Sequence, residues 1–318
     1  MHMRIMETYA KTSHFKWEWR SLNTDELSRD EYASCYHQWG GSFIVHPDVL
    51  RYFEDVHGIK ARYRGYFRHG QCVGAIAVWG EFIAGDYSAL RAHRMIDKVD
   101  FGYPAVYLPI DPSHRCTILY KAKYLLKLQR PQLAGLLFLK QDAKSMAILK
   151  KIPEELPSGK KEFQLKTRRF ERQGGVVRDV QEFSGEEVAG IYIDLFRQRW
   201  GDVPHASHSL GETLSVLKKF LFGKILCLGE TPVAIQLNFR ADTRRTICID
   251  YVNGGADKSL KKLSPGALLS YINGRNAWEE SRLANKLLVY SYGKANVEYK
   301  EQWCHSVPRG LSGLWLPS

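Results

Sequence analysis

The chain has 318 residues, of which 44% are hydrophobic and 25% are charged. This composition allows a sizeable buried core and excludes global disorder, and the length predicts two domains. Lys and Arg outnumber Asp and Glu by 46 to 34, and the formal net charge of +12 favours anionic partners, although many soluble proteins are equally basic without one.

Neither the apolar runs nor the cysteines indicate a special compartment. No apolar run approaches the roughly 20 residues of a membrane-spanning helix, and residues 1–19 do not resemble a secretion signal. We therefore expect a cytoplasmic protein, either free or resting on the inner face of the membrane. The six cysteines lack zinc spacing and are expected to be free thiols, with a thiol nucleophile left open.

The first half contains helix and hairpin signals. Apolar residues at helical spacing predict a helix over residues 47–56, ended by Gly58. Two extended segments flank a tight turn and predict a hairpin. The remaining predictions are hairpin strands at 64–67 and 72–79, strands at 105–109 and 133–139, and a helix over 113–129.

A stretch rich in Pro and Gly at residues 152–159 predicts a linker, which divides the chain into 1–157 and 158–318. The second unit begins with a basic helix-compatible segment, KKEFQLKTRRFERQGG. Its other predicted elements are strands at 176–180, 225–228, 233–240, 246–252 and 286–292, and helices over 186–200, 214–222 and 265–282, the last capped by Ser264. The two halves share an order of elements, which indicates a duplicated α/β unit.

This order is that of the GNAT acyltransferase fold. The segments KTRRFERQGG, DLFRQRW, VAIQLNF, KLSPGALLSYI and YKEQW resemble the FemAB/CelD-like tandem transferases, over roughly residues 161–303. The whole chain also resembles the bacterial macrophage-induced virulence proteins of antimicrobial-peptide resistance. The resemblance implies an α/β fold with mixed sheets, two tandem GNAT-like domains, and transfer of an acyl or aminoacyl group from acyl-CoA or aminoacyl-tRNA to an amine.

The segment KLSPGALLSYI is a candidate donor site, because a helix N-terminus suits a phosphate or pyrophosphate. By resemblance to acyl-CoA-dependent relatives, the candidates are Lys261, Lys262, Ser264 and Gly266. The fuller glycine-rich phosphate loop of those relatives is absent. A capped helix start with solvent-facing lysines is therefore the alternative, and coenzyme A stays an open question.

Two residues are candidate bases. Asp250 lies on a strand that borders the transfer cleft in this fold, and could accept the proton of an attacking amine. The alternative is a structural ion pair with Arg240 or Arg245. His205, in the loop segment WGDVPHASH, is the second candidate, although loop histidines are usually solvated.

The segment YKEQW holds the third candidate site. In FemAB-like transferases a lysine between two aromatics lies in the substrate channel, and Lys300 matches it between Tyr299 and Trp303. The match implies that Lys300 supports charge developing on the acyl carbonyl, with Tyr299, Trp303, Tyr292 and Lys294 contacting substrate. The alternative is a helical turn whose aromatics pack while Lys300 is solvated.

Two functions follow. The first is an N-acyltransferase with an anionic co-substrate and no metal; the second is a non-catalytic protein on a transferase scaffold, peripheral to the membrane, that promotes antimicrobial-peptide tolerance. The basic segment over residues 160–172 could bind tRNA or an anionic membrane, or be a packed helix with solvated basic flanks. DNA is a weaker partner, because no segment predicts a helix-turn-helix.

Overall fold

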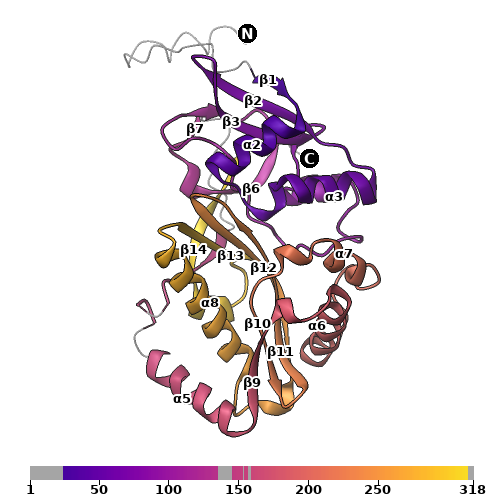
Figure 1. The fold of residues 1–318 in the computed structure, drawn as a ribbon, viewed down its shortest axis with the longest axis vertical. Coiled ribbons are helices and arrows are strands. Elements are labelled where there is room, and N and C mark those ends of the chain that lie inside the picture. The colour runs from indigo at the N-terminus through magenta and orange to yellow at the C-terminus, as the bar shows by residue number, and fades with distance from the viewer. Residues whose placement is uncertain (1–23, 135–144, 153, 157–158, 314–318) are drawn as a thin grey trace, which may run out of the picture.

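The computed structural model describes residues 24–134, 145–152, 154–156 and 159–313, and shows the predicted α/β fold, with helices and strands in both halves of the chain (Figure 1). The elements of the first half are β1 Thr24–Leu27, α2 Arg29–Trp39, η2 Phe43–Val45, α3 Pro47–His57, β2 Arg62–Arg68, β3 Gln71–Trp79, β4 Phe82–Ile83, α4 Tyr87–Ala92, β5 Cys116–Thr117, β6 Ala122–Leu126, η3 Lys127–Gln129, β7 Leu133–Ala134 and β8 Ser145–Leu149. Those of the second half are α5 Gly159–Arg172, β9 Gly175–Asp179, η4 Val180–Glu182, α6 Gly185–Trp200, α7 Leu210–Val216, η5 Lys218–Phe220, β10 Lys224–Leu228, β11 Thr231–Asp242, β12 Thr246–Ala256, η6 Lys258–Leu260, α8 Pro265–Leu283, β13 Leu287–Lys294, α9 Tyr299–Trp303 and β14 Cys304–Ser312.

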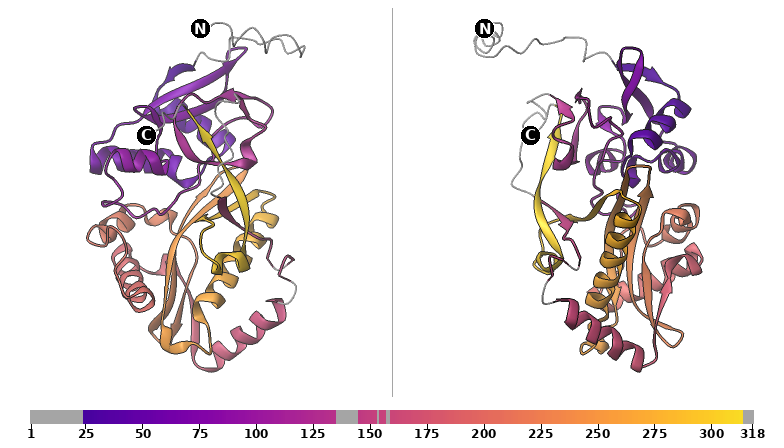
Figure 2. Two further views of the ribbon diagram at one scale, coloured as in Figure 1. Left: turned by 180° about the vertical axis from the view of Figure 1, so that it is seen from behind. Right: turned by 60° about the vertical axis from the view of Figure 1, so that its left-hand side comes forward.

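The two halves share one sheet. An eight-stranded sheet has the order β6-β14-β8-β13-β12-β11-β10-β9, so strands β6 and β8 of the first half lie beside strands of the second. Strand β14 pairs with β8 on one side and with β6 on the other, and Figure 2 shows it crossing from the second half into the first. The predicted division after residue 157 falls outside the described residues and stays a prediction.

Helices cover both faces of this sheet. Helix α8 packs on β10 to β13 on one face, where its Leu268 and Leu269 are fully buried. Helix α6 packs on β11 and β12 on the opposite face, beside residues of the first half (Figures 1 and 2). Since both faces of β11 are covered, seven consecutive residues from Val233 to Phe239 are buried.

Local sequence signals account for most of the second half. Ser184 and Glu187 form a capping box at the start of α6, and Gly201 ends the helix in a left-handed conformation with φ 78°. Strands β10, β11 and β12 form the predicted antiparallel series, and α5 is the predicted basic helix. In the first half, α3 and the β2–β3 hairpin likewise confirm the predictions.

Residues 113–129 do not form the predicted helix. They contain β5, β6 and η3 instead, because β6 pairs with β14, whose residues lie more than 180 positions later. The predicted strand at 105–109 is not formed as a strand; it has one isolated bridge, Val106 to Leu125, and Ile110 just after it bridges Gly74. The predicted strand at 133–139 is observed only as β7, since residues 135–144 lie outside the described part.

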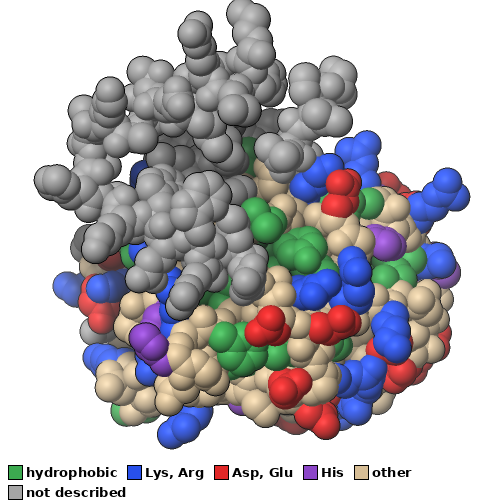
Figure 3. Space-filling view, turned by 90° about the horizontal axis from the view of Figure 1, so that it is seen from above, with side chains coloured by type: hydrophobic (Ala, Val, Ile, Leu, Met, Phe, Trp, Pro, Cys, Tyr) green, Lys and Arg blue, Asp and Glu red, His purple; other side chains and the backbone are tan. Residues whose placement is uncertain are grey.

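Surface charge and hydropathy complete the description. Figure 3 shows basic and acidic side chains interspersed over the face seen from above, so the net positive charge is not concentrated there. Among the described helices, none combines the length and the apolar character needed to cross a bilayer.

Candidate functional site

The candidate site lies where two parallel strands part. Strands β12 and β13 pair in parallel from Thr246 opposite Leu287 to Asp250 opposite Ser291. Beyond this point β12 continues along β11, whereas Lys294 of β13 pairs with Met146 of β8. In sheets of this kind ligands bind in the crevice beyond the carboxyl ends of the strands. We name the surroundings of these diverging ends the strand fork.

The register of β12 also changes at the fork. Tyr251 is opposite Asn238 and Asn253 is opposite Leu237, which leaves Val252 as an extra residue in a β-bulge. A bulge re-aims side chains and disrupts pairing, and bulges are frequent beside active sites. The fork therefore follows from two features of the backbone, a bulge and a change of partner strand.

Asp250 lies at the closed end of the fork and is 4% exposed. Its Oδ1 accepts a hydrogen bond from the Ala105 N–H at 2.9 Å, whereas its Oδ2 has no hydrogen-bond partner among the described residues. Burial raises the pKa of Asp250 to about 7, and the Ala105 N–H opposes this shift. A carboxyl group with this pKa can exchange a proton near neutral pH.

The predicted alternative for Asp250, an ion pair with Arg240 or Arg245, is wrong. Arg240 is bound to Glu280 and to Asp242, and the Arg245 guanidinium lies over the Trp39 ring at 5.2 Å. Both arginines have other partners. Within the described part of the chain, no cation pairs with the Asp250 carboxylate.

A segment of the first half crosses the fork. A Cβ on Gly102 would lie 3.4 Å from the Val252 Cα, and one on Gly293 would lie 3.3 Å from the Tyr103 Cβ. The Lys294 ammonium lies 3.8 Å from the centroid of the Tyr103 ring. The segment thus packs closely on both diverging strands, and brings Lys294, a predicted substrate contact, against an aromatic ring.

Asp100, in this crossing segment, is a candidate that the sequence analysis missed. Burial raises its pKa to about 6, opposed by a hydrogen bond from the Gly102 N–H and by the nearby His205. His205 itself is exposed on the loop after α6. No local motif marks Asp100, because its place beside the fork depends on how the halves pack.

Lys300 is not solvated, so the alternative of a helical turn with Lys300 in solvent is wrong. Its ammonium donates to the carbonyl oxygens of Tyr292 at 2.6 Å and Lys294 at 2.8 Å, on the strand that leaves the fork. Gly293 between them has φ 69°, a conformation that favours glycine. Burial lowers the pKa of Lys300 to about 8. The ammonium has three protons and uses two, so one remains for another acceptor.

The other predicted aromatics differ in exposure. Trp303 is 3% exposed and packs against Phe163, with ring centroids 5.3 Å apart. Tyr292 is also buried and stacks on Tyr251 at 4.5 Å. Tyr299 is half-buried, and the Arg199 guanidinium lies 5.4 Å from its ring centroid. Of the three, Tyr299 is the one a substrate could reach without a rearrangement of the core.

Arg199 and Trp200 at the end of α6 are further residues that the sequence analysis did not single out. The Arg199 Nη1 and the Trp200 Nε1 both donate to the Gly254 carbonyl, at 3.1 and 3.2 Å. The Trp200 ring is 47% exposed, and the Arg199 guanidinium lies 4.6 Å from its centroid. A cation and an exposed aromatic ring thus lie at the end of β12. Both residues belong to the segment DLFRQRW, whose resemblance to the FemAB-like transferases could have marked them as candidates.

The predicted donor-binding residues lie at the start of α8. Ser264 is left-handed with φ 47°, and its hydroxyl donates to the Lys261 carbonyl at 3.1 Å, so the predicted side-chain cap is wrong. No side chain caps this helix, which leaves its first N–H groups, including that of Gly266, available to a phosphate. Lys261 and Lys262 are exposed beside it. These features fit a phosphorylated donor.

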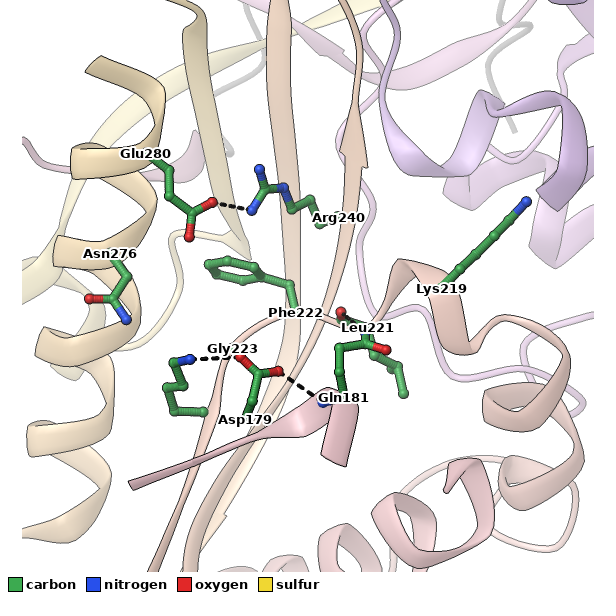
Figure 4. Close-up of a pocket in the computed structure, with 10 residues that line it drawn as sticks. Asp179, Gln181, Lys219, Leu221, Phe222, Gly223, Arg240, Asn276 and Glu280 are labelled. Atoms are coloured by element: carbon green, nitrogen blue, oxygen red, sulfur yellow. Dashed lines mark hydrogen bonds and ion pairs between the residues drawn. The ribbon is translucent and has the colours of Figure 1, made fainter. Parts of the chain in front are cut away.

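A separate pocket of about 340 Å³ lies between α8, β9 and η5 (Figure 4). Its charged groups are held in ion pairs: Lys224 with Asp179, Arg240 with Glu280, and Lys219 with Asp48. We therefore place the candidate site at the strand fork, where Asp250 lacks a counter-charge. Within the described residues there is also no group of three His, Cys, Asp or Glu side chains suited to a metal ion.

Comparison with known proteins gives a family and a fold. The family model described as Mig-14 matches residues 46–311. No curated protein matches the chain in sequence.

Among solved structures, the crystal structure of FemX aligns over 92% of this chain and 97% of its own, with a TM-score of 0.51 and 10% identity. The C-terminal domain of a putative lysylphosphatidylglycerol synthetase from Agrobacterium fabrum covers 90% of this chain and 92% of its own, at a TM-score of 0.44 and 13% identity. A tandem GNAT protein from the clavulanic acid biosynthesis pathway covers 91% of this chain and 96% of its own, at a TM-score of 0.38 and 9% identity. At these identities the likeness to FemX shows the fold.

Proposed function

The chain belongs to the Mig-14 family, and from this premise we propose that it is a transferase that moves an acyl or aminoacyl group onto an amine, in bacterial resistance to cationic antimicrobial peptides. The observation that carries the proposal is the buried Asp250 carboxylate, with one oxygen unpartnered, at the closed end of the strand fork.

In the proposed reaction the acceptor amine attacks the carbonyl carbon of the donor ester or thioester. A C–N bond forms, the C–O or C–S bond to the donor breaks, and tRNA or coenzyme A leaves with its hydroxyl or thiol protonated. Asp250 accepts the proton that the amine loses, because its pKa of about 7 leaves a substantial fraction ionised at neutral pH. Asp100, beside the crossing segment, is the second candidate base. A base within hydrogen-bond reach contributes about 10²- to 10⁴-fold to such a step.

Lys300 supplies positive charge on the other side of the fork. Its third ammonium proton can be donated to the carbonyl oxygen as that oxygen becomes negative. The half-buried position of Lys300 strengthens the interaction, since charge is screened less there than in water. In this proposal the bonds to the Tyr292 and Lys294 carbonyls hold the ammonium in place.

The donor is proposed to approach along the end of β12 toward the start of α8. Acyl-CoA and aminoacyl-tRNA both carry phosphate groups, which the uncapped N–H groups of α8 with Lys261 and Lys262 suit. Both donors also carry an adenine, and the exposed Trp200 ring offers a stacking surface. These contacts apply to both donors, so the experiment must separate them.

The test supplies purified protein with radiolabelled aminoacyl-tRNA in one arm and radiolabelled acyl-CoA in the other, each with amine-bearing acceptors from a bacterial envelope extract. We expect label on the acceptor in one arm, and loss of that transfer in Asp250→Asn. Asp194→Asn is the matched control, because Asp194 is exposed on α6 away from the fork. No transfer and no donor binding in either arm would refute the proposal.

A second function is favoured by the surface of α5. Lys161, Arg168, Arg169 and Arg172 are exposed, and Leu165 beside them is 54% exposed. Basic and apolar side chains on one helix suit an anionic membrane surface. A non-catalytic, membrane-peripheral role would show as salt-sensitive sedimentation with anionic liposomes that Leu165→Ser with Arg168→Ser weakens. Equal sedimentation with neutral liposomes would count against it.

A further inference from the structure

Three of the six free cysteines meet in the first half of the molecule. Cys35 on α2 and Cys72 on β3 have their sulfur atoms 3.8 Å apart. Cys116 on β5 lies near both of them, close enough for its thiol to interact electrostatically with each. Cys227, Cys248 and Cys304 lie on strands of the other half. The cluster is outside the strand fork and takes no part in the proposed transfer.

The two close cysteines differ in access to solvent. Cys35 is 4% exposed, whereas Cys72 is half-buried in the β2–β3 hairpin. The two thiols are in hydrogen-bond contact, which lowers the pKa of Cys72, and burial opposes this shift. Cys72 is therefore partly thiolate at neutral pH and open to a small oxidant, while Cys35 keeps its proton.

We propose that Cys35 and Cys72 are a peroxide-sensitive pair that forms a reversible disulfide. Their sulfur atoms are in contact without a bond, and they must approach from 3.8 Å to about 2.05 Å. The bond would join α2 to β3 across 37 positions of sequence. Neither residue belongs to the proposed catalytic machinery, so this inference stands apart from the transfer reaction.

The chemistry has two steps. The Cys72 thiolate attacks one oxygen of hydrogen peroxide, so that an S–O bond forms, the O–O bond breaks, and the departing hydroxide takes a proton to become water. Cys35 then loses its proton and attacks the Cys72 sulfur, forming the S–S bond and releasing a second water. Two thiols are oxidised and one peroxide is reduced to two waters. A dithiol reductant reverses the change.

The experiment treats the full chain with a small excess of hydrogen peroxide, blocks remaining thiols with an alkylating reagent, and maps peptides by mass spectrometry without reduction. We expect a peptide pair joined through Cys35 and Cys72, with the loss of two hydrogen atoms, and its disappearance on adding dithiothreitol. Oxidised protein should also melt at a higher temperature than reduced protein, because the link restricts the unfolded chain.

Variants identify the second cysteine. In Cys35→Ala, Cys72 should progress to sulfinic or sulfonic acid, whereas Cys116→Ala should keep the cross-link. Cys227→Ala is the control for a thiol of the other half. A Cys72–Cys116 link, oxidised Cys72 without any link, or thiols that all stay free would overturn the proposal. If the Cys35 variant fails to fold, the peptide map of the unaltered chain decides alone.

Discussion

Among the described residues, Asp86 in the first half and Asp250 in the second are two almost fully buried aspartates whose oxygens are used differently. Asp86 is fully buried, and its carboxylate accepts three backbone N–H bonds, from Ser88, Lys123 and Tyr124, at 2.8 to 3.0 Å. Asp250 is almost as buried but accepts one bond, from Ala105, and its second oxygen is unpartnered. Burial raises the pKa of both.

The difference separates a structural carboxylate from a chemical one. Asp86 begins α4 and holds β6 in place, so its hydrogen-bonding capacity serves the fold. Asp250 lies at the last residue pair before β12 and β13 part, and its Oδ2 has no partner among the described residues. Burial alone therefore does not identify a functional carboxylate. A buried carboxylate oxygen without a hydrogen-bond partner, close to where two strands separate, is a better indication.

The largest expected effect is on transfer. Asp250→Asn keeps the shape of the side chain but removes its ability to accept a proton, so the rate of transfer should fall about 10³-fold. Asp86→Asn should leave the rate per folded molecule within about threefold. Single-turnover rates at equal folded concentration measure both, and an active Asp250→Asn protein would erase the distinction between the two aspartates.

Lys300→Met should reduce transfer about 10²-fold, because it removes the cation on the other side of the fork. The matched control is Lys150→Met. Lys150 is also half-buried and also donates to backbone carbonyls, those of Glu301 at 2.6 Å and Gln302 at 3.4 Å on α9. Equal losses in both variants would mean that the lysines only hold α9 in place.

Asp86→Asn should lower the free energy of unfolding by about 2 kcal/mol. The amide nitrogen would replace a carboxylate oxygen that now accepts hydrogen bonds from backbone N–H groups, and those groups would lose their acceptor. Asp250→Asn has a single such bond to lose. Urea unfolding at pH 7 measures both free energies. A loss in Asp250→Asn as large as that in Asp86→Asn would indicate that Asp250 is structural too.

The pH dependence of stability should isolate Asp250. Its pKa is raised from its ordinary acidic range to about 7, so the folded protein holds a proton that the unfolded chain releases. The free energy of unfolding should therefore fall as pH rises from about 4 to 7. Between pH 5 and pH 8, the stability of Asp250→Asn should rise by about 2 to 3 kcal/mol relative to that of the unaltered chain. A pH-independent difference would contradict the raised pKa.

The smallest effect concerns the start of α8. Reversing the charge of Lys261 and Lys262 should weaken donor binding about threefold at low salt, and less at high salt, because both side chains are exposed. Titration calorimetry with the active donor measures this. Lys258→Glu is a nearby control on the same loop. A loss that does not depend on salt would indicate a direct structural role instead.

Elements that depend on local sequence signals were predicted correctly, whereas those that depend on distant partners were not. The β10–β12 series and α6 were predicted, because turns, caps and alternation are local signals. Residues 113–129 were assigned wrongly, because the partner of β6 is the distant β14. In the second half a 19-residue helix, α8, connects the parallel strands, whereas in the first half Val106 bridges Leu125 without one. The shared order thus conceals a difference between the halves.

The site was predicted in part for the same reason. Asp250 was proposed because its face followed from alternation and its strand borders the cleft in the fold that the sequence resembles, although its expected arginine partners were wrong. Asp100 was missed because it reaches the fork only through the crossing segment. The Lys300 motif was recognised, but its two carbonyl acceptors could not be. Local patterns indicate which residues are apt, and packing decides which of them meet.

The position of β14 has a consequence for how the chain is made. This strand is the last described strand to be synthesised, and it lies between β6 and β8, which are made much earlier. Until it arrives, β6 and β8 lack a neighbour and expose unpaired strand edges, which are prone to aggregation. Folding of the first half must therefore wait for nearly the whole chain, so a nascent chain stalled before residue 304 should depend strongly on chaperones.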